Sequence, residues 1–169
     1  MRADERPYRR NVGVALFNRA GKVLIARRLR DDGPEIILPS REWQMPQGGV
    51  DGDEDPLAAA RRELWEETSF THAEHLGTAS GWMDYNFPPY RGPWHRLCAF
   101  RGQSQLWHAF RFTGKDDEVD VTGRGGADPE FSTWRWESLD RVASLVVPFK
   151  RSIYERIAME FRAFGQKTS

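Results

Sequence analysis

Short apolar runs at the start of the chain predict β-strands. The segments 11–18 and 22–28 are rich in β-branched and aliphatic residues, and the sequence RAGK supplies a turn between them. Two such runs around a short glycine-containing turn favour a β-hairpin. Residues 29–42 contain two prolines and a glycine, so they predict a loop in which EIIL is a candidate short strand.

The next stretch predicts a strand, a loop and a helix. The sequence WQMPQGGVDGDED (43–55) has the pattern of a short strand followed by a glycine-rich loop. Asp55 then favours the N-cap of a helix, and Pro56 favours its first position because the N–H that proline lacks is unpaired there in any case. The helix is expected to run from Pro56 to about Thr68.

The second half of the chain alternates between strand-like and loop-like segments. Strands are expected within 74–87, 104–112 and 131–139, where apolar residues partly alternate with polar ones. Residues 115–130 are acidic at first and then glycine-rich, which predicts a loop with at most a short strand.

A second helix is expected near the end of the chain, over residues 149–165. Gly165 is its expected stop, and its apolar side chains recur at helical spacing: Ile153, Ile157, Phe161 and Phe164. Strands mixed with two separated helices indicate an α/β fold. The length of 169 residues suits one domain with a real core, so residues 1–169 are expected to form a single domain.

Charge and cysteine content narrow the classes of function. The 25 basic and 25 acidic residues cancel, so no overall field attracts nucleic acid or a membrane, and a polyanion would have to meet local clusters. Cys98 is the single cysteine, which excludes an intrachain disulfide and fits a reducing compartment. The N-terminus lacks the apolar stretch of a signal peptide, and no run approaches the roughly 20 apolar residues of a membrane span. We expect a cytoplasmic protein with neither DNA nor a membrane as partner, and the oligomeric state stays open.

Three glutamates crowd into the predicted first helix. Glu63, Glu66 and Glu67 are three or four residues apart, so they form one stripe with β-carbons about 5–6 Å apart. The stripe borders the apolar face of the helix, which consists of Leu57, Ala60 and Leu64. Two like charges at about 6 Å repel by roughly 3 kcal/mol at an effective dielectric of about 20, and by only a few tenths on an exposed helix.

This crowding has two interpretations. The glutamates form a solvated helix face whose repulsion Arg61 and Arg62 moderate, or they bind a divalent cation that turns the repulsion into coordination. Ligands that are all oxygen favour Mg²⁺ or Mn²⁺ over Zn²⁺. The sequence around the helix distinguishes between a solvated face and a cation site.

The sequence from Gly48 to Phe70, GGVDGDEDPLAAARRELWEETSF, resembles the Nudix box. That pattern is Gly, five residues, Glu, seven residues, and then Arg-Glu-hydrophobic-any-Glu-Glu-any-Gly-hydrophobic. Eight of its nine positions are filled in register, by Gly48, Glu54, Arg62, Glu63, Leu64, Glu66, Glu67 and Phe70. Ser69 is the departure, because it stands where the family has glycine.

The resemblance implies the Nudix fold, which is a mixed β-sheet sandwiched between helices. It also implies that Glu63, Glu66 and Glu67 bind Mg²⁺, for which Mn²⁺ can substitute, together with a backbone carbonyl at Gly48 or Gly49. Such metals screen phosphate charge and activate water for attack on phosphorus. Which glutamate also serves as the base is left open.

Further segments resemble the bacterial RNA 5′-pyrophosphohydrolase and dinucleoside polyphosphate hydrolase group. They include WQMPQGGVD, DPEFSTWRW and VVPFKRSIYERIAMEF, and the resemblance covers most of residues 6–162. The implied substrates are 5′-triphosphorylated RNA, dinucleoside polyphosphates such as diadenosine tetraphosphate, or both. The alternatives are another nucleotide, such as ADP-ribose or a damaged nucleoside triphosphate, and an inactive nucleotide-sensing module, which would be expected to lack the carboxylates.

The resemblance assigns roles to single residues as well. Glu54 and Arg62 are expected to hold the glycine-rich loop and the helix together. Glu130 would be a fourth acidic metal ligand or the base, and otherwise a surface glutamate. Arg9 and Arg28 fit contacts with phosphate or base, although both could equally lie free on the surface.

The remaining substrate candidates lie at or just before the start of the last helix and, for Tyr85, within the 74–87 segment. Phe149 and Lys150 fit a base-stacking wall and a phosphate contact, and stacking of a base on an aromatic ring contributes about 1–3 kcal/mol. Val147 would belong to the same wall, whereas core packing is the alternative for Phe149. Tyr85 is expected to approach the phosphates.

Ser69 raises a question about the end of the first helix. Glycine there would end the helix in a left-handed turn at little cost, whereas serine should cost roughly 1 kcal/mol in the same geometry. Ser69 supplies no ligand, so we expect it to alter the turn and leave catalysis intact.

Overall fold

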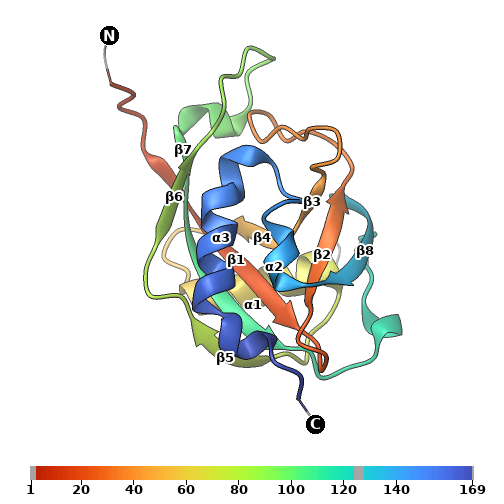
Figure 1. Ribbon diagram of the computed structural model, residues 1–169. Coiled ribbons are helices and arrows are strands. Elements are labelled where there is room, and N and C mark those ends of the chain that lie inside the picture. The colour runs from red at the N-terminus through yellow and green to blue at the C-terminus, as the bar shows by residue number, and fades with distance from the viewer. Residues whose placement is uncertain (1–2, 124–127, 169) are drawn as a thin grey trace.

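The computed structural model describes residues 3–123 and 128–168 and is shown in Figure 1. Its strands are β1 (Tyr8–Phe17), β2 (Val23–Arg28), β3 (Trp43–Gln44), β4 (Gln47–Gly49), β5 (Glu74–Thr78), β6 (Met83–Asn86), β7 (Gly102–Arg111) and β8 (Phe131–Glu137). Its α-helices are α1 (Pro56–Thr68), α2 (Leu139–Val142) and α3 (Arg151–Glu160). Short 3-10 helices occupy Arg96–Ala99, Asp116–Glu118, Pro148–Lys150 and Arg162–Gly165.

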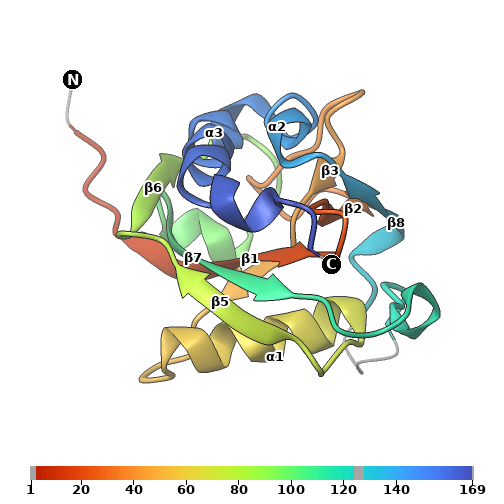
Figure 2. The same cartoon turned by 60° about the horizontal axis from the view of Figure 1, so that its bottom comes forward.

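The strands form one mixed sheet around the parallel pair of β1 and β7. This pair stays in register from Tyr8, opposite Gly102, to Phe17, opposite Arg111. The other pairings are antiparallel: β2 and β4 with β1, β3 and β8 with β2, and β5 and β6 with β7. Figure 2 shows α1 on one side of the sheet and α2 with α3 on the other. The predicted fold, a mixed sheet between helices, is therefore confirmed.

β1 is buried on both of its faces, which explains its continuous apolar sequence. Val12, Val14 and Leu16 belong to the hydrophobic cluster that includes α1. Ala15 and Phe17 belong to the cluster that includes α2 and α3. Side chains alternate across a strand, so a strand that helices cover on both sides needs apolar residues at every position.

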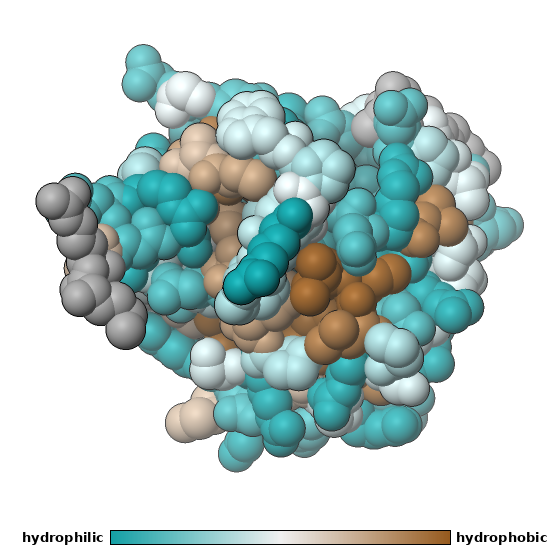
Figure 3. All heavy atoms as spheres, turned by 90° about the horizontal axis from the view of Figure 1, so that it is seen from above, coloured by the Kyte–Doolittle hydropathy of each residue, from teal (hydrophilic) through white to brown (hydrophobic). Residues whose placement is uncertain are grey.

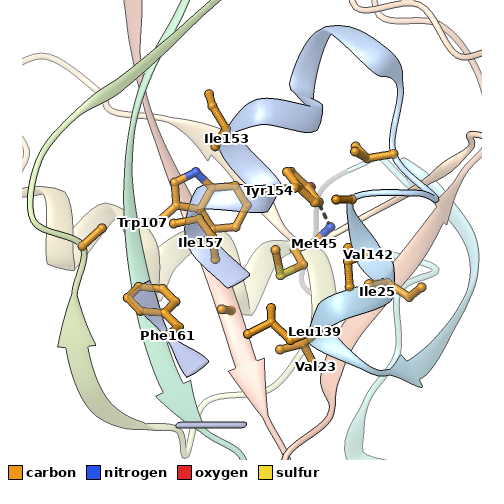
Figure 4. Close-up of a cluster of buried hydrophobic side chains, with 14 of the residues drawn as sticks. Val23, Ile25, Met45, Trp107, Leu139, Val142, Ile153, Tyr154, Ile157 and Phe161 are labelled. Atoms are coloured by element: carbon orange, nitrogen blue, oxygen red, sulfur yellow. Dashed lines mark hydrogen bonds between the residues drawn. The ribbon is translucent and has the colours of Figure 1, made fainter. Parts of the chain in front are cut away.

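The cluster under α3 also fixes the segment that leads into the glycine-rich loop. Figure 4 shows Tyr154 of α3 beside Met45, which lies between β3 and β4. The Tyr154 hydroxyl accepts a hydrogen bond of 3.0 Å from the Met45 N–H. The Tyr154 ring packs edge-on against Trp107, with ring centroids 5.4 Å apart. α3 therefore supports the strand that carries Gly48.

α1 begins and ends at the predicted residues. The Asp55 carboxylate caps it by accepting a hydrogen bond of 3.1 Å from the Ala58 N–H. The helix ends at Ser69, which has φ 63° and ψ 15°. The expectation that serine alters the turn is therefore wrong, because Ser69 adopts the left-handed geometry that glycine would have. Its hydroxyl donates a hydrogen bond of 3.0 Å to the Asp120 carbonyl, which offsets part of the strain.

The predicted hairpin forms only at its turn. The Asn18 N–H donates to the Lys22 carbonyl at 2.9 Å. The register between β1 and β2 is a single pair, Phe17 opposite Val23. Beyond that pair the strands diverge, because β4 pairs with β1 while β3 and β8 pair with β2.

The 29–42 loop contains no regular strand, so the prediction of a strand at EIIL is wrong. An isolated bridge pairs Asp32 with Glu35. The carbonyls of Glu35 and Ile36 accept hydrogen bonds from Arg28 at 2.7 and 3.3 Å. Contacts with side chains, and not a sheet partner, therefore fix this segment.

The regular part of the last helix is shorter than predicted. α3 covers Arg151–Glu160, and 3-10 turns precede and follow it. The predicted apolar face is confirmed, because Ile153, Ile157 and Phe161 are buried and Phe164 packs against them. Within the described ranges, no helix has the length and apolar character needed to cross a bilayer.

Candidate active site

A polar pocket of about 150 Å³ lies where β4, α1 and the 29–42 loop meet. It is lined by Arg9, Asn11, Arg28, Asp32, Glu35, Gln44, Gln47, Gly48, Gly49, Glu63, Glu66, Arg96, Leu97, Gln103, Glu130 and Lys150. A hollow of about 40 Å³ shares Glu63, Glu66 and Glu130 with the pocket and adds Glu67. Figure 3 views the end of the molecule at which α3 begins, where hydrophilic residues surround a hydrophobic patch.

Arg62 ties the glycine-rich loop to α1. Its Nε and Nη2 donate to the two carboxylate oxygens of Glu54, both at 2.9 Å. Nη2 also donates to the Gly49 carbonyl at 2.8 Å. A bidentate pair of this kind fixes the orientation of both planar groups. These are the contacts that the predicted role of Glu54 and Arg62 requires.

The metal-binding glutamates predicted from the box lie beside the backbone of β4. A β-carbon on Gly48 would be 1.9 Å from the carboxyl carbon of Glu63, so a side chain at that position would displace the Glu63 carboxylate or the loop. Oε2 of Glu67 accepts a hydrogen bond of 3.1 Å from the Gln47 N–H. Glu66 is half-buried on the same side of α1 and also lines the pocket.

Buried negative charge accumulates here. Burial raises the pKa of Glu63 to about 7. Arg62 acts to lower this pKa, whereas the charges of Glu66 and Glu130 raise it further. The pKa of Glu67 lies well above its ordinary value because of burial and of the charges of Glu130 and Glu63. Loss of water contact likewise raises the pKa of Glu130. Carboxylates that repel each other away from water favour a cation among them.

The donor set suits a hard divalent cation, because it consists of carboxylate oxygens. Across residues 3–123 and 128–168, however, no three His, Cys, Asp or Glu side chains converge closely enough to define a metal centre. Nη1 of Arg62 donates to Oε1 of Glu63 at 2.8 Å and to Oε2 of Glu66 at 3.2 Å. A cation that uses these two oxygens has to replace those contacts, whereas the pair of Arg62 with Glu54 can stay.

Glu130 reaches the site from a distant part of the sequence. The pairing of β8 with β2 places it beside Leu29, whose N–H donates to the Glu130 carbonyl at 2.9 Å. Glu130 lines both hollows together with Glu63 and Glu66. The fold thus brings the predicted acidic residues into one region, and their roles stay predictions.

Cationic side chains line the same pocket. Arg9 lies against Gly49, where an added β-carbon would be 2.1 Å from Nη2 of Arg9. Arg28 projects from the end of β2, and Lys150 from the turn that precedes α3. The structure therefore places these three predicted substrate contacts in the pocket lining.

The structure places Tyr85 and Val147 outside the lining of the polar pocket, and their roles as substrate contacts stay predictions. Val147 is buried in the hydrophobic cluster under α3 and does not line the polar pocket. Tyr85 is also buried, and its hydroxyl donates to Glu35 and so has a protein partner already. Phe149 packs against Tyr85 with ring centroids 5.9 Å apart, which agrees with the alternative of core packing.

Glu35, the acidic partner of Lys150, was not predicted from the sequence. Oε2 of Glu35 lies 2.8 Å from Nζ of Lys150, and both side chains are buried. The signal for such a partner was the position of Glu35 between Pro34 and Ile36 in the sequence. A glutamate in apolar surroundings is seldom buried unless it is paired with an opposite charge. Asp32 and Arg96, which also line the pocket, were missed as well.

The fold and the site define a Nudix hydrolase. The NUDIX domain family matches residues 7–157, and the chain belongs to this family, whose members generally use divalent metal ions.

Two bacterial relatives match nearly the whole chain. The RNA pyrophosphohydrolase of Azorhizobium caulinodans is 48% identical over 97% of this chain and 98% of its own. The RNA pyrophosphohydrolase of Acidiphilium cryptum is 50% identical over 95% of this chain and 93% of its own. Among solved structures, the MutT protein from Methanosarcina mazei Go1 has a TM-score of 0.63, with 21% identity over 94% of this chain and 98% of its own. This structural likeness supports the fold alone.

Proposed function

We propose that this protein hydrolyses the 5′-terminal triphosphate of RNA and uses Mg²⁺, for which Mn²⁺ can substitute. The observation that carries the proposal is one pocket lined by both carboxylates and cationic side chains. Carboxylates suit the metal, and guanidinium and ammonium groups suit phosphate. The similarity to RNA pyrophosphohydrolases over nearly the full chain supports RNA as the substrate.

In this proposal the metal is held by Glu63, Glu66, Glu67 and Glu130, with the Gly48 carbonyl nearby. The bound ion would screen phosphate charge and make a water more acidic. The assignment of the base among these glutamates stays open.

The cationic residues bind the substrate in this proposal. Arg9, Arg28 and Lys150 would contact the phosphates or the terminal nucleotide. Because the net charge of the chain is zero, RNA would be recognised mainly at its 5′ end and not along its backbone. We also propose a single domain and a cytoplasmic location, which the one cysteine supports.

A paired assay tests the substrate. The purified protein with Mg²⁺ is given triphosphorylated RNA and, separately, diadenosine tetraphosphate, and the products and values of kcat/KM are compared. We expect RNA to be converted to its monophosphorylated form with the higher kcat/KM, and RNA with a 5′-hydroxyl to inhibit weakly. Conversion of the dinucleotide alone would move the proposal to dinucleoside polyphosphates. Turnover of neither compound would contradict it.

A further inference from the structure

A buried ion pair joins the 29–42 loop to the start of α3. Glu35 is 3% exposed and Lys150 is 1% exposed, and their charged atoms lie 2.8 Å apart. Removing two charges from water is costly, and an apolar pair of similar volume would often stabilise the fold as well or better. Such a pair beside a binding pocket therefore suggests a use beyond stability.

The carboxylate of Glu35 has little freedom to move. Its Oε1 accepts hydrogen bonds from Nε2 of Gln103, at 2.8 Å, and from the Tyr85 hydroxyl. Gln103 is fixed in turn, because its Oε1 accepts from Asn11 at 2.9 Å and from Arg9 at 3.2 Å. Glu35 is therefore a rigid anchor for whatever its second oxygen contacts.

That second oxygen contacts Lys150, and the geometry leaves Lys150 available to a ligand. An ammonium group has three N–H donors. The contacts of Nζ with polar protein atoms, as far as the structure describes them, are Oε2 of Glu35 at 2.8 Å and Oε1 of Gln44 at 3.2 Å. Lys150 also lines the polar pocket, so its remaining donor can meet a phosphate oxygen there.

We propose that Glu35 is a positioning residue for substrate binding, which fixes the charged ammonium of Lys150 where it meets a substrate phosphate. The inference rests on the proposed function, in which Lys150 binds phosphate. Glu35 could instead compete with phosphate for Lys150, which would weaken binding. The fixed carboxylate and the second acceptor on Gln44 favour positioning, because together they orient the ammonium from the protein side.

The hydrogen bond from Arg28 to residue 35 does not involve the side chain of Glu35. The bond of 2.7 Å from Arg28 ends on the backbone carbonyl of Glu35, and it does not involve the carboxylate. Glu35→Gln therefore keeps the shape of the side chain and the backbone contact but removes the charge that faces Lys150.

The experiment compares wild type with Glu35→Gln, Lys150→Met and the double variant on triphosphorylated RNA with Mg²⁺. Each single substitution is expected to raise KM by roughly tenfold, with kcat changed less than about twofold, because the lost contact binds substrate and transition state alike. The double variant should have the KM of Lys150→Met, since Glu35 acts only through Lys150. Glu74→Gln, an exposed change on β5, is the matched control and should leave KM unchanged.

Several results would overturn the inference. They are an unchanged or lower KM for Glu35→Gln, an unchanged KM for Lys150→Met, or fully additive effects in the double variant. If Glu35→Gln does not fold, Glu35→Asp replaces it in the experiment. Aspartate keeps the charge but is one methylene shorter, so it should no longer hold the Lys150 ammonium in place. An unchanged KM for Glu35→Asp would also overturn the inference. If wild type leaves triphosphorylated RNA intact, the proposed function fails and the inference falls with it.

Discussion

Gly48 leaves no room for a side chain, so its replacement by alanine tests the geometry of the site. The added β-carbon would lie 1.9 Å from the carboxyl carbon of Glu63, whereas ordinary contact begins near 3.4 Å. The loop or the carboxylate therefore has to move by about 1.5 Å. A misplacement of about 1 Å can cost on the order of 100-fold in rate, so Gly48→Ala is expected to lower kcat by at least roughly that factor.

The assay measures initial rates with triphosphorylated RNA together with thermal unfolding. Stability should fall by only about 1–3 kcal/mol, the usual cost of overpacking, so the variant should still fold. Gly81→Ala is the control, because a β-carbon there meets no atom within 4 Å, and its rate should equal that of wild type. A folded Gly48→Ala protein with the wild-type rate would show that the close approach of Gly48 and Glu63 does not limit the rate.

Further predictions concern the helix end, the buried acids and α3. Ser69→Ala should lower the unfolding free energy by about 1 kcal/mol through the lost hydrogen bond, whereas Ser69→Gly should leave it within about 0.5 kcal/mol because relief of left-handed strain compensates. Turnover should be unchanged in both, and equal stability of wild type and Ser69→Ala would contradict the first estimate. The raised pKa values of Glu63, to about 7, and of Glu67 mean that folding favours their protonated forms. With a chelator, the stabilising contribution of Glu63 should therefore be fully present below about pH 4.5 and be lost as pH rises through about 7, and that of Glu67 should be lost in the same direction. Thermal unfolding at several pH values checks this, and a pH dependence unchanged in Glu67→Gln would count against it. Tyr154→Phe should cost about 1–3 kcal/mol, measured by denaturant unfolding, because it leaves the Met45 N–H without its acceptor. A loss below about 0.5 kcal/mol would show that this bond contributes little.

Local signals made α1 and its glutamate stripe predictable. The cap at Asp55, the proline after it and the spacing of the carboxylates are all short-range features, and the structure has the helix at the predicted bounds. The functional link between the glycine-rich loop and this helix was predicted from the resemblance to the Nudix box. The periodicity of apolar residues does not indicate that link.

Long-range contacts explain what the sequence could not predict. The partner of Lys150 is Glu35, which lies in a loop where the resemblance is weak, and only the folded chain brings the two together. The same carboxylate accepts a hydrogen bond from the hydroxyl of Tyr85, a long-range contact that the sequence did not predict. At Ser69 the cost of a left-handed turn was predictable, but the hydrogen bond to the Asp120 carbonyl, which helps to keep that turn, was not.

The most direct test of the account is the rate of 5′-triphosphate hydrolysis by Glu67→Gln in Mg²⁺. This substitution keeps the shape of the side chain and can still accept the hydrogen bond from the Gln47 N–H, but it removes the carboxylate. We predict that the variant folds like wild type and loses nearly all conversion of triphosphorylated to monophosphorylated RNA. A folded Glu67→Gln protein that retains the wild-type rate would contradict the assignment of this site.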